Sequence, residues 1–269
     1  MQAQDIDDVL RLLSGIIADC KAVRDPLGYF PALYRQVTLE VKKGIDQGFF
    51  ADGPRMDRFD ALFASRYFEA YAAFRSGGTP SKAWQVAFDA TRSGRLIILQ
   101  DLLVGINAHI NLDLGVVTGE TFQGAALAGF HGDFLKINAI LETLVPQVEE
   151  VVGRFSPLLA LLSTIGGKDA LEVLDFSMDA ARDDAWLHAN LVALTPPANR
   201  PLLIRTIDEK TAFLGRLVSR PPGFVRETVK IIRSLESRNV PAIIDALDSI
   251  VRMDEPALLA TVDPARVEP

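Results

Sequence analysis

The longest strongly apolar segment of the chain, residues 96–117, contains polar side chains that an apolar core does not readily accommodate. It reads LIILQDLLVGINAHINLDLGVV, and its polar residues include Asn107, His109, Asn111 and Asp113. Residues three and four apart share one face of a helix, so His109 and Asp113 lie one turn apart on an otherwise apolar stripe. We therefore expect the pair to point inward, where a carboxylate is costly unless it is paired, hydrogen-bonded or metal-bound.

Two interpretations of this pair remain open. In the first, His109 and Asp113 form a structural polar pair that fixes the helix against its neighbours. In the second, they belong to a functional site, either as ligands of one divalent metal ion or as an acid/base pair at the bottom of a pocket. Two ligands one turn apart can reach a single ion, but any helix with His and Asp four residues apart has this spacing.

Nearly every long segment repeats its apolar residues with the period of an amphipathic helix, and none alternates as a strand does. The sequence therefore predicts an all-α bundle of roughly ten helices with no sheet. Thr79 is expected to cap a helix that begins at Pro80, and Pro146 to kink its helix without ending it. The expected helices span residues 6–23, 29–47, 54–75, 80–91, 96–117, 122–154, 156–165, 168–194, 198–219, 224–237 and 240–253.

The chain contains no Gly/Ser-rich linker long enough to separate two domains. We expect a single all-α domain over residues 1–253, followed by a loosely ordered, proline-containing tail at 254–269. The Pro/Gly stops near 195–197 and 220–223 leave a second arrangement open, in which residues 198–253 form a helical appendage.

Composition excludes several classes of function. The net charge of −7 leaves no broad basic footprint, so no nucleic-acid partner is expected. The single cysteine, Cys20, excludes a disulfide framework and thiolate-rich metal sites. The acidic start is unlike a secretory signal, and the charge-free apolar runs are shorter than a membrane span, so we expect a cytoplasmic protein without a membrane partner. A homodimer is compatible with the sequence.

Two further helices carry polar residues on apolar faces. Residues 54–75 form an aromatic stripe on which Asp60 and Tyr67 share a face, with Arg66 beside Tyr67. Arg182 lies on an otherwise apolar face of the helix 168–194, and arginine is rarely buried without an anion. Its candidate partners are Asp179, Asp113, Asp60 and Asp133.

These residues support two versions of a site. A one-metal site would use His109, Asp113 and one further carboxylate, Asp133 or Asp60, to polarise a substrate oxygen or activate water. Without a metal, His109 would transfer protons beside Asp113 and Tyr67, and Arg182 would bind an anionic group. The residues expected to contact the ligand are Asp60, Arg66, Asn107, Asn138 and Trp186.

The other two histidines and the missing motifs narrow the chemistry. His188 is expected at the surface or an interface, and His131 fits a pocket or the surface equally. No phosphate-cradling loop, no G-x-S-x-G elbow and no Glu-x-x-His pair occurs in the chain.

The segments AHINLDL, HGDFLKIN and AARDDAWLHA, together with GYFPALYRQVT and DGPRMDRFDALFASRYF, carry a resemblance. Over roughly residues 5–250 the chain resembles an uncharacterised, mainly actinobacterial family known as a domain of unknown function. The resemblance implies an all-α soluble protein and brings no activity with it. The motif positions that match are His109, Asp113, Asp133, Asn138, Arg182 and Trp186, with Arg66 and Tyr67 in the earlier segment.

The architecture also resembles, more faintly, the all-α fold of zinc-dependent phospholipase C and P1-type nucleases, which use His-x-x-x-Asp pairs. Those enzymes hold three zinc ions with several more histidines, whereas this chain has only 3 histidines in all. The resemblance therefore concerns the architecture alone. The small number of histidines argues against a trinuclear zinc enzyme.

The leading hypothesis is a protein that binds or transforms a small, largely apolar molecule with a polar or anionic group. As an enzyme it would be a hydrolase or an acid/base catalyst, assisted by one divalent metal or by His109 directly. The alternative is a non-catalytic helical scaffold or partner-binding protein. In that case His109, Asp113 and Arg182 form only a structural network.

Overall fold

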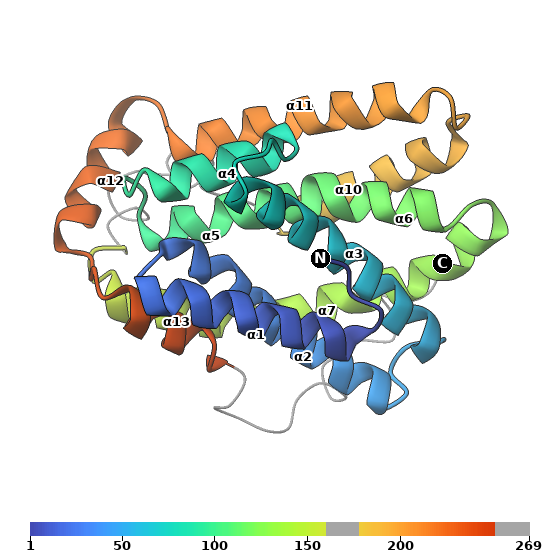
Figure 1. Ribbon diagram of the computed structural model, residues 1–269, viewed down its shortest axis with the longest axis horizontal. Helices are drawn as coiled ribbons and strands as arrows, with labels where there is room; N and C mark the ends of the chain where they lie inside the picture. Colours follow the sequence, from blue (N-terminus) through green and yellow to red (C-terminus); the bar gives the residue numbers. More distant parts are fainter. Residues whose placement is uncertain (160–177, 251–269) are drawn as a thin grey trace.

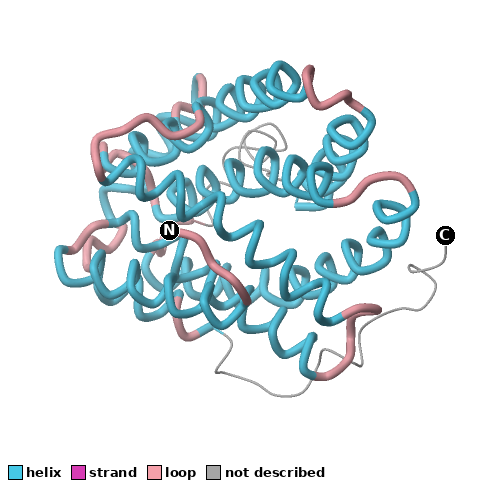
Figure 2. The backbone as a smooth tube through the Cα atoms, turned by 45° about the vertical axis from the view of Figure 1, so that its right-hand side comes forward, coloured by secondary structure: helices cyan, strands magenta, loops and turns pink. Residues whose placement is uncertain are grey.

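A computed structural model describes residues 1–159 and 178–250, which form helices joined by loops and contain no strand (Figure 2). They form ten α-helices when the continuous helix Ile98–Thr121 is counted once, which confirms the all-α fold class. The helices are α1 (Ile6–Val23), α2 (Tyr29–Asp46), α3 (Gly53–Arg75), α4 (Lys82–Arg92), α5 (Ile98–Asn107), α6 (Gly115–Thr121), α7 (Ala125–Phe155), α10 (Met178–Leu194), α11 (Arg200–Ser219), α12 (Gly223–Leu235) and α13 (Val240–Leu247), with a 3-10 turn η1 (Pro26–Gly28) and a π-helical segment η2 (Ala108–Leu114).

The continuous helix α5–η2–α6 forms the centre of the fold. Its segments contact α2, α3, α4, α10 and α11, so other helices surround it along its length. In Figure 1, α4 and α11 lie on one side of it, and α1, α2, α7 and α13 lie on the other. Helix α3 crosses between these two groups and contacts α1, α2, α4 and η2.

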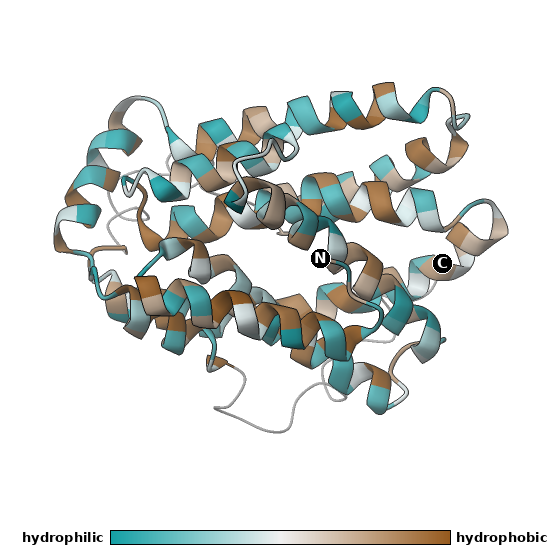
Figure 3. Ribbon diagram, in the orientation of Figure 1, coloured by the Kyte–Doolittle hydropathy of each residue, from teal (hydrophilic) through white to brown (hydrophobic). Residues whose placement is uncertain are grey.

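This central helix is long and apolar enough to span a membrane by length and composition alone. Its most apolar window has a mean hydropathy of 1.3, and 94% of that window is buried inside the protein. Figure 3 shows apolar and polar residues alternating along the surrounding helices, as in amphipathic helices. Sequence inspection missed this feature because Asp101 and Asp113 interrupt the charge-free runs.

Carboxylates and hydroxyls cap the first turns of several helices. The side chain of Asp52 accepts a hydrogen bond from the Arg55 N–H at the start of α3. Helix α4 is capped by Ser81, which accepts from the Trp84 N–H, and it begins at Lys82. The expected cap at Thr79 with a helix start at Pro80 is therefore wrong.

The long helix α7 begins later than expected and continues through a proline. Phe122 is in an extended conformation and Gly124 has a positive φ of 55°, which delays the helix to Ala125. Pro146 lies inside the helix, as expected. Most of the helix expected at 156–165, residues 168–177 of the next one, and the tail 254–269 lie outside the described residues.

Two glycines allow α10 to pack closely on the central helix. A Cβ atom at Gly115 would lie 2.7 Å from the Ala185 carbonyl oxygen, and one at Gly119 would meet the Ala189 carbonyl oxygen. Both neighbours are backbone atoms of α10 and cannot rotate away. The two helices therefore approach each other through small residues one turn apart, as in small-xxx-small helix pairs.

We expect Gly115→Ala to destabilise the protein by roughly 1–3 kcal/mol, because the added methyl group overpacks a rigid contact. Gly129→Ala is the matched control, since Gly129 lies on the exposed face of α7 and its Cβ would meet nothing within 4 Å. That variant should gain up to about 1 kcal/mol from helix propensity. Urea unfolding measures the free energy of unfolding of both variants. Equal free energies for Gly115→Ala and Gly129→Ala would contradict the close contact between α10 and the central helix.

Candidate functional site

The polar residues of the central helix lie on a segment of unusual backbone geometry. Residues Ala108–Leu114 form a π-helix between two α-helical segments, and all seven are buried. π-Helices are rare, appear mostly as single-turn bulges and are frequent at functional sites. The segment places His109 and Asp113 in the interior beside α2, α3 and α4.

Asp113 is a buried carboxylate with one strong hydrogen bond. Trp84 donates its indole N–H to Asp113 Oδ2 at 2.7 Å. The guanidinium of Arg66 lies farther away, with Nε 3.8 Å from Oδ1, and the Arg66 side chain is 35% exposed. Asp113 is therefore fixed by α4 on one side and approached from the solvent side by α3.

His109 is enclosed by aromatic rings. Its imidazole stacks on Phe63 with ring centroids 3.8 Å apart, and the Tyr34 ring meets it edge-on at 4.4 Å. Neither ring nitrogen has a hydrogen-bond partner in the described part of the chain. Nδ1 lies 3.7 Å from Asp113 Oδ2, which is beyond hydrogen-bond distance.

Burial lowers the pKa of His109, and the nearby Asp113 carboxylate opposes this shift only in part. The imidazole is therefore neutral near pH 7, with one nitrogen that donates and one that accepts. Neither the donor nor the acceptor nitrogen forms a hydrogen bond, which is uncommon for a polar side chain that is only 4% exposed.

Asp60 and Tyr34 add two more unpartnered polar groups. Among the described residues, Asp60 Oδ2 and the Tyr34 hydroxyl lack hydrogen-bond partners. Burial, with a smaller contribution from the charge of Asp57, raises the pKa of Asp60 from 3.8 to about 7. Burial also raises the pKa of Tyr34, and the charges of Asp60 and Asp113 act in the same direction. We call Tyr34, Asp60, Phe63, His109 and Asp113 the His109 cluster.

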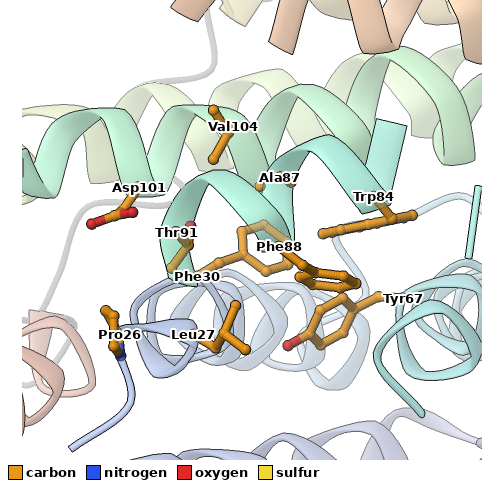
Figure 4. A pocket seen from close by; sticks show the side chains of 11 residues that line it. Pro26, Leu27, Phe30, Tyr67, Trp84, Ala87, Phe88, Thr91, Asp101 and Val104 are labelled. Atoms are coloured by element: carbon orange, nitrogen blue, oxygen red, sulfur yellow. The ribbon is translucent and has the colours of Figure 1, made fainter. Parts of the chain in front are cut away.

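A small cavity of about 20 Å³ lies beside the cluster, which is room for about one water molecule. Phe30, Tyr67 and Trp84 line it, and the Tyr67 hydroxyl points toward the Leu27 side of it (Figure 4). That hydroxyl has no hydrogen-bond partner among the residues the structure describes. Tyr67 thus contributes its ring to the aromatic wall and its hydroxyl to the cavity.

One buried acid, Asp101, is among the residues that line this cavity. Burial raises the pKa of Asp101 well above its usual range, while a hydrogen bond with Thr91 lowers it in part. Sequence inspection did not single out Asp101 or Tyr34. A carboxylate near the start of the apolar helix, and aromatic residues at positions 30 and 34 one turn apart, were the available signals.

Three expected site residues lie together elsewhere, between α7 and α10. Arg182 donates from Nε to Asn138 Oδ1 and from Nη2 to the Phe134 carbonyl oxygen at 2.6 Å. Its guanidinium also stacks over the Phe134 ring at 4.4 Å. Trp186 stacks on His131 with ring centroids 4.3 Å apart. The structure therefore gives Arg182 partners on α7.

Asn107 and Asp133 have structural bonds of their own. Asn107 donates to the Thr211 carbonyl oxygen and accepts from Asn111, both at 3.0 Å, which ties the central helix to α11. Asp133 accepts from the Ala51 N–H at 2.7 Å and from Arg55 Nη2 at 2.7 Å. These bonds hold the loop after α2 and the start of α3 against α7.

The structure does not bring Asp133 together with His109 and Asp113. Within residues 1–159 and 178–250, no three His, Cys, Asp or Glu side chains converge as a metal site would need. His188, which was expected at the surface or an interface, is buried, because it packs against Gly115 of the central helix.

The family model of DUF5995, a family of unknown function, matches residues 6–221. The chain therefore belongs to this family, in agreement with the resemblance seen in its motifs. Comparison with curated proteins found no match, and neither did comparison with solved structures. The expected architectural likeness to zinc-dependent phospholipase C and P1-type nucleases thus has no support from them.

The raised pKa of Asp60 has a measurable consequence for stability. The folded protein keeps a proton that the unfolded chain releases between about pH 4 and pH 7, so this group makes the protein less stable as pH rises through that window. Asp60→Asn removes the effect, and its stability relative to wild type should increase by up to ~4 kcal/mol from pH 4 to pH 8.

Urea unfolding at several pH values measures this difference. Asp46→Asn, a change at an exposed carboxylate of α2, is the matched control and should follow the wild-type curve. Parallel curves for wild type and Asp60→Asn would show that the pKa of Asp60 is not raised.

Proposed function

We propose that the His109 cluster binds the polar group of a small, largely apolar molecule and exchanges protons with it. The observation that carries the proposal is the set of four unpartnered polar atoms in the cluster, seen within the described residues: the Tyr34 hydroxyl, Asp60 Oδ2 and both ring nitrogens of His109. Each such buried group costs about 1–3 kcal/mol if nothing bonds to it. A ligand with donors and acceptors would remove that cost.

The surroundings suit a molecule that is mainly apolar. Phe63 and Tyr34 face His109, and Phe30 and Trp84 lie at ring distances of 5.6 and 6.2 Å from it. Ligand sites commonly combine such aromatic walls with a few convergent polar groups. The cavity beside the cluster has room for about one water molecule, so a larger ligand would require these rings to move apart. Arg66 lies at the edge of the cluster, where a partly exposed guanidinium could bind an anionic group of the ligand.

The acid/base properties of the cluster suit proton transfer near neutral pH. Neutral His109 can accept a proton, and the adjacent Asp113 carboxylate would stabilise the imidazolium that forms. Asp60, with a pKa of about 7, is partly protonated at neutral pH and can act as the acid. The reaction class that fits is an acid/base rearrangement or a hydrolysis.

A structural network remains the competing explanation for the cluster, and His109→Phe separates the two. Phenylalanine fills the same space against Phe63 and removes both unpartnered nitrogens. If His109 is kept for function, the variant should keep the wild-type melting temperature or exceed it, because functional residues commonly cost stability. If His109 holds the fold together, the melting temperature should fall by several degrees.

His131→Phe is the matched control, since it also replaces a ring-stacked histidine but lies between α7 and α10. Thermal shift with phenol, indole and phenylacetate then tests binding. At least one probe should raise the melting temperature of wild type and of His131→Phe, and none should raise that of His109→Phe. A destabilised His109→Phe, with no response of wild type to any probe, would favour the structural network.

A further inference from the structure

A large groove lies at the opposite end of α5 from the His109 cluster. Its volume is about 870 Å³, and it is formed by α4, the turn before α5, the end of α11, and α12. None of the residues that line it belongs to the His109 cluster. Its basic residues are Arg95, Arg216, Arg220, Arg226, Lys230, Arg233 and Arg238, and we call it the basic groove.

The charge of the basic groove is opposite to that of the whole chain. The net charge of the protein is −7, yet seven of the residues lining the groove are cationic and only Asp89 is acidic. Lys230 pairs with Glu227, whereas none of the groove's six arginines forms an ion pair with a carboxylate in the described part of the chain. The carboxylates of Glu236 and Glu209 lie near Arg233 and Arg216 without forming ion pairs with them, and the lining of the groove itself is predominantly cationic.

Two of these arginines are held in position by backbone carbonyl groups. Arg233 donates from Nε to the Leu96 carbonyl oxygen at 3.2 Å and from Nη2 to that of Gly94. Arg226 donates from Nε to the Pro221 carbonyl oxygen at 3.3 Å. A guanidinium has five N–H donors, so each arginine keeps donors for a further acceptor. Fixing the side chains in advance reduces the entropy that binding an anion would cost.

The floor of the groove is apolar. Leu96, Val229 and Pro221 are buried residues that line it between the basic side chains. A ligand that fits both features has an organic part against this floor and several negative charges among the arginines. Arginine matches phosphate oxygens with paired N–H donors, and the volume lies in the range of small-molecule sites.

We propose that the basic groove binds a small organic molecule that carries two or more phosphate groups, such as a nucleoside triphosphate. A long nucleic acid fits less well, because it would extend from the groove onto the surface of a protein whose net charge is negative. This site is independent of the function proposed for the His109 cluster, since the two share no lining residue.

The test is isothermal titration of the full chain with ATP, AMP, inorganic pyrophosphate and a short single-stranded DNA. The groove variant is Arg216→Gln with Arg238→Gln, and the control is Arg58→Gln with Arg205→Gln, which removes the same charge from exposed positions outside the groove. We expect ATP to bind wild type and the control more tightly than AMP does. The groove variant should bind ATP at least about tenfold more weakly.

Three results would overturn the proposal. The first is no binding of ATP or pyrophosphate by wild type up to about 1 mM. The second is an equal loss in the groove and control variants, which would show that only net charge matters. The third is DNA that binds more tightly than ATP and depends on the same arginines, which would assign the groove to nucleic acid. All of the substituted arginines are exposed, and circular dichroism checks that each variant folds.

Discussion

The hydrogen bond from the Trp84 indole to Asp113 allows a carboxylate to lie at the centre of this all-α fold. Without it, the central helix would bury a negative charge with only distant partners, at a cost that the surrounding apolar contacts would have to offset. The bond joins α4 to the π-helical segment and so fixes the position of the neighbouring His109.

The buried polar residues of the protein fall into two groups. Asn107, Asp133 and Arg182 have their donors or acceptors bonded to backbone or side-chain partners, and each ties two helices together. In the His109 cluster, by contrast, Tyr34 and His109 bury polar atoms that have no partner in the described residues. The first group explains how the bundle is held together, whereas the unpartnered atoms of the second are the reason to propose a ligand.

The period of the apolar residues was enough to predict the helices, because each helix buries one continuous apolar stripe. The same pattern correctly placed His109 and Asp113 in the protein interior. It could not reveal the π-helix Ala108–Leu114, since a short change of backbone period leaves no clear trace in the pattern of apolar residues. Nor could the pattern of apolar residues reveal which distant helix supplies the hydrogen-bond partner of a buried polar side chain. Arg182 bonds to Asn138 and to the Phe134 carbonyl oxygen on α7, and these partners follow from packing and not from spacing.

A high-resolution crystal structure with ordered solvent would test most directly whether the His109 cluster is a site. We expect a water or small molecule within hydrogen-bond distance of a His109 ring nitrogen, the Tyr34 hydroxyl or Asp60 Oδ2, because these atoms have no other partner in the described residues. Direct hydrogen bonds that link His109 to Asp113 and Tyr34 to Asp60, with no bound molecule between them, would contradict this expectation and make the cluster a structural network.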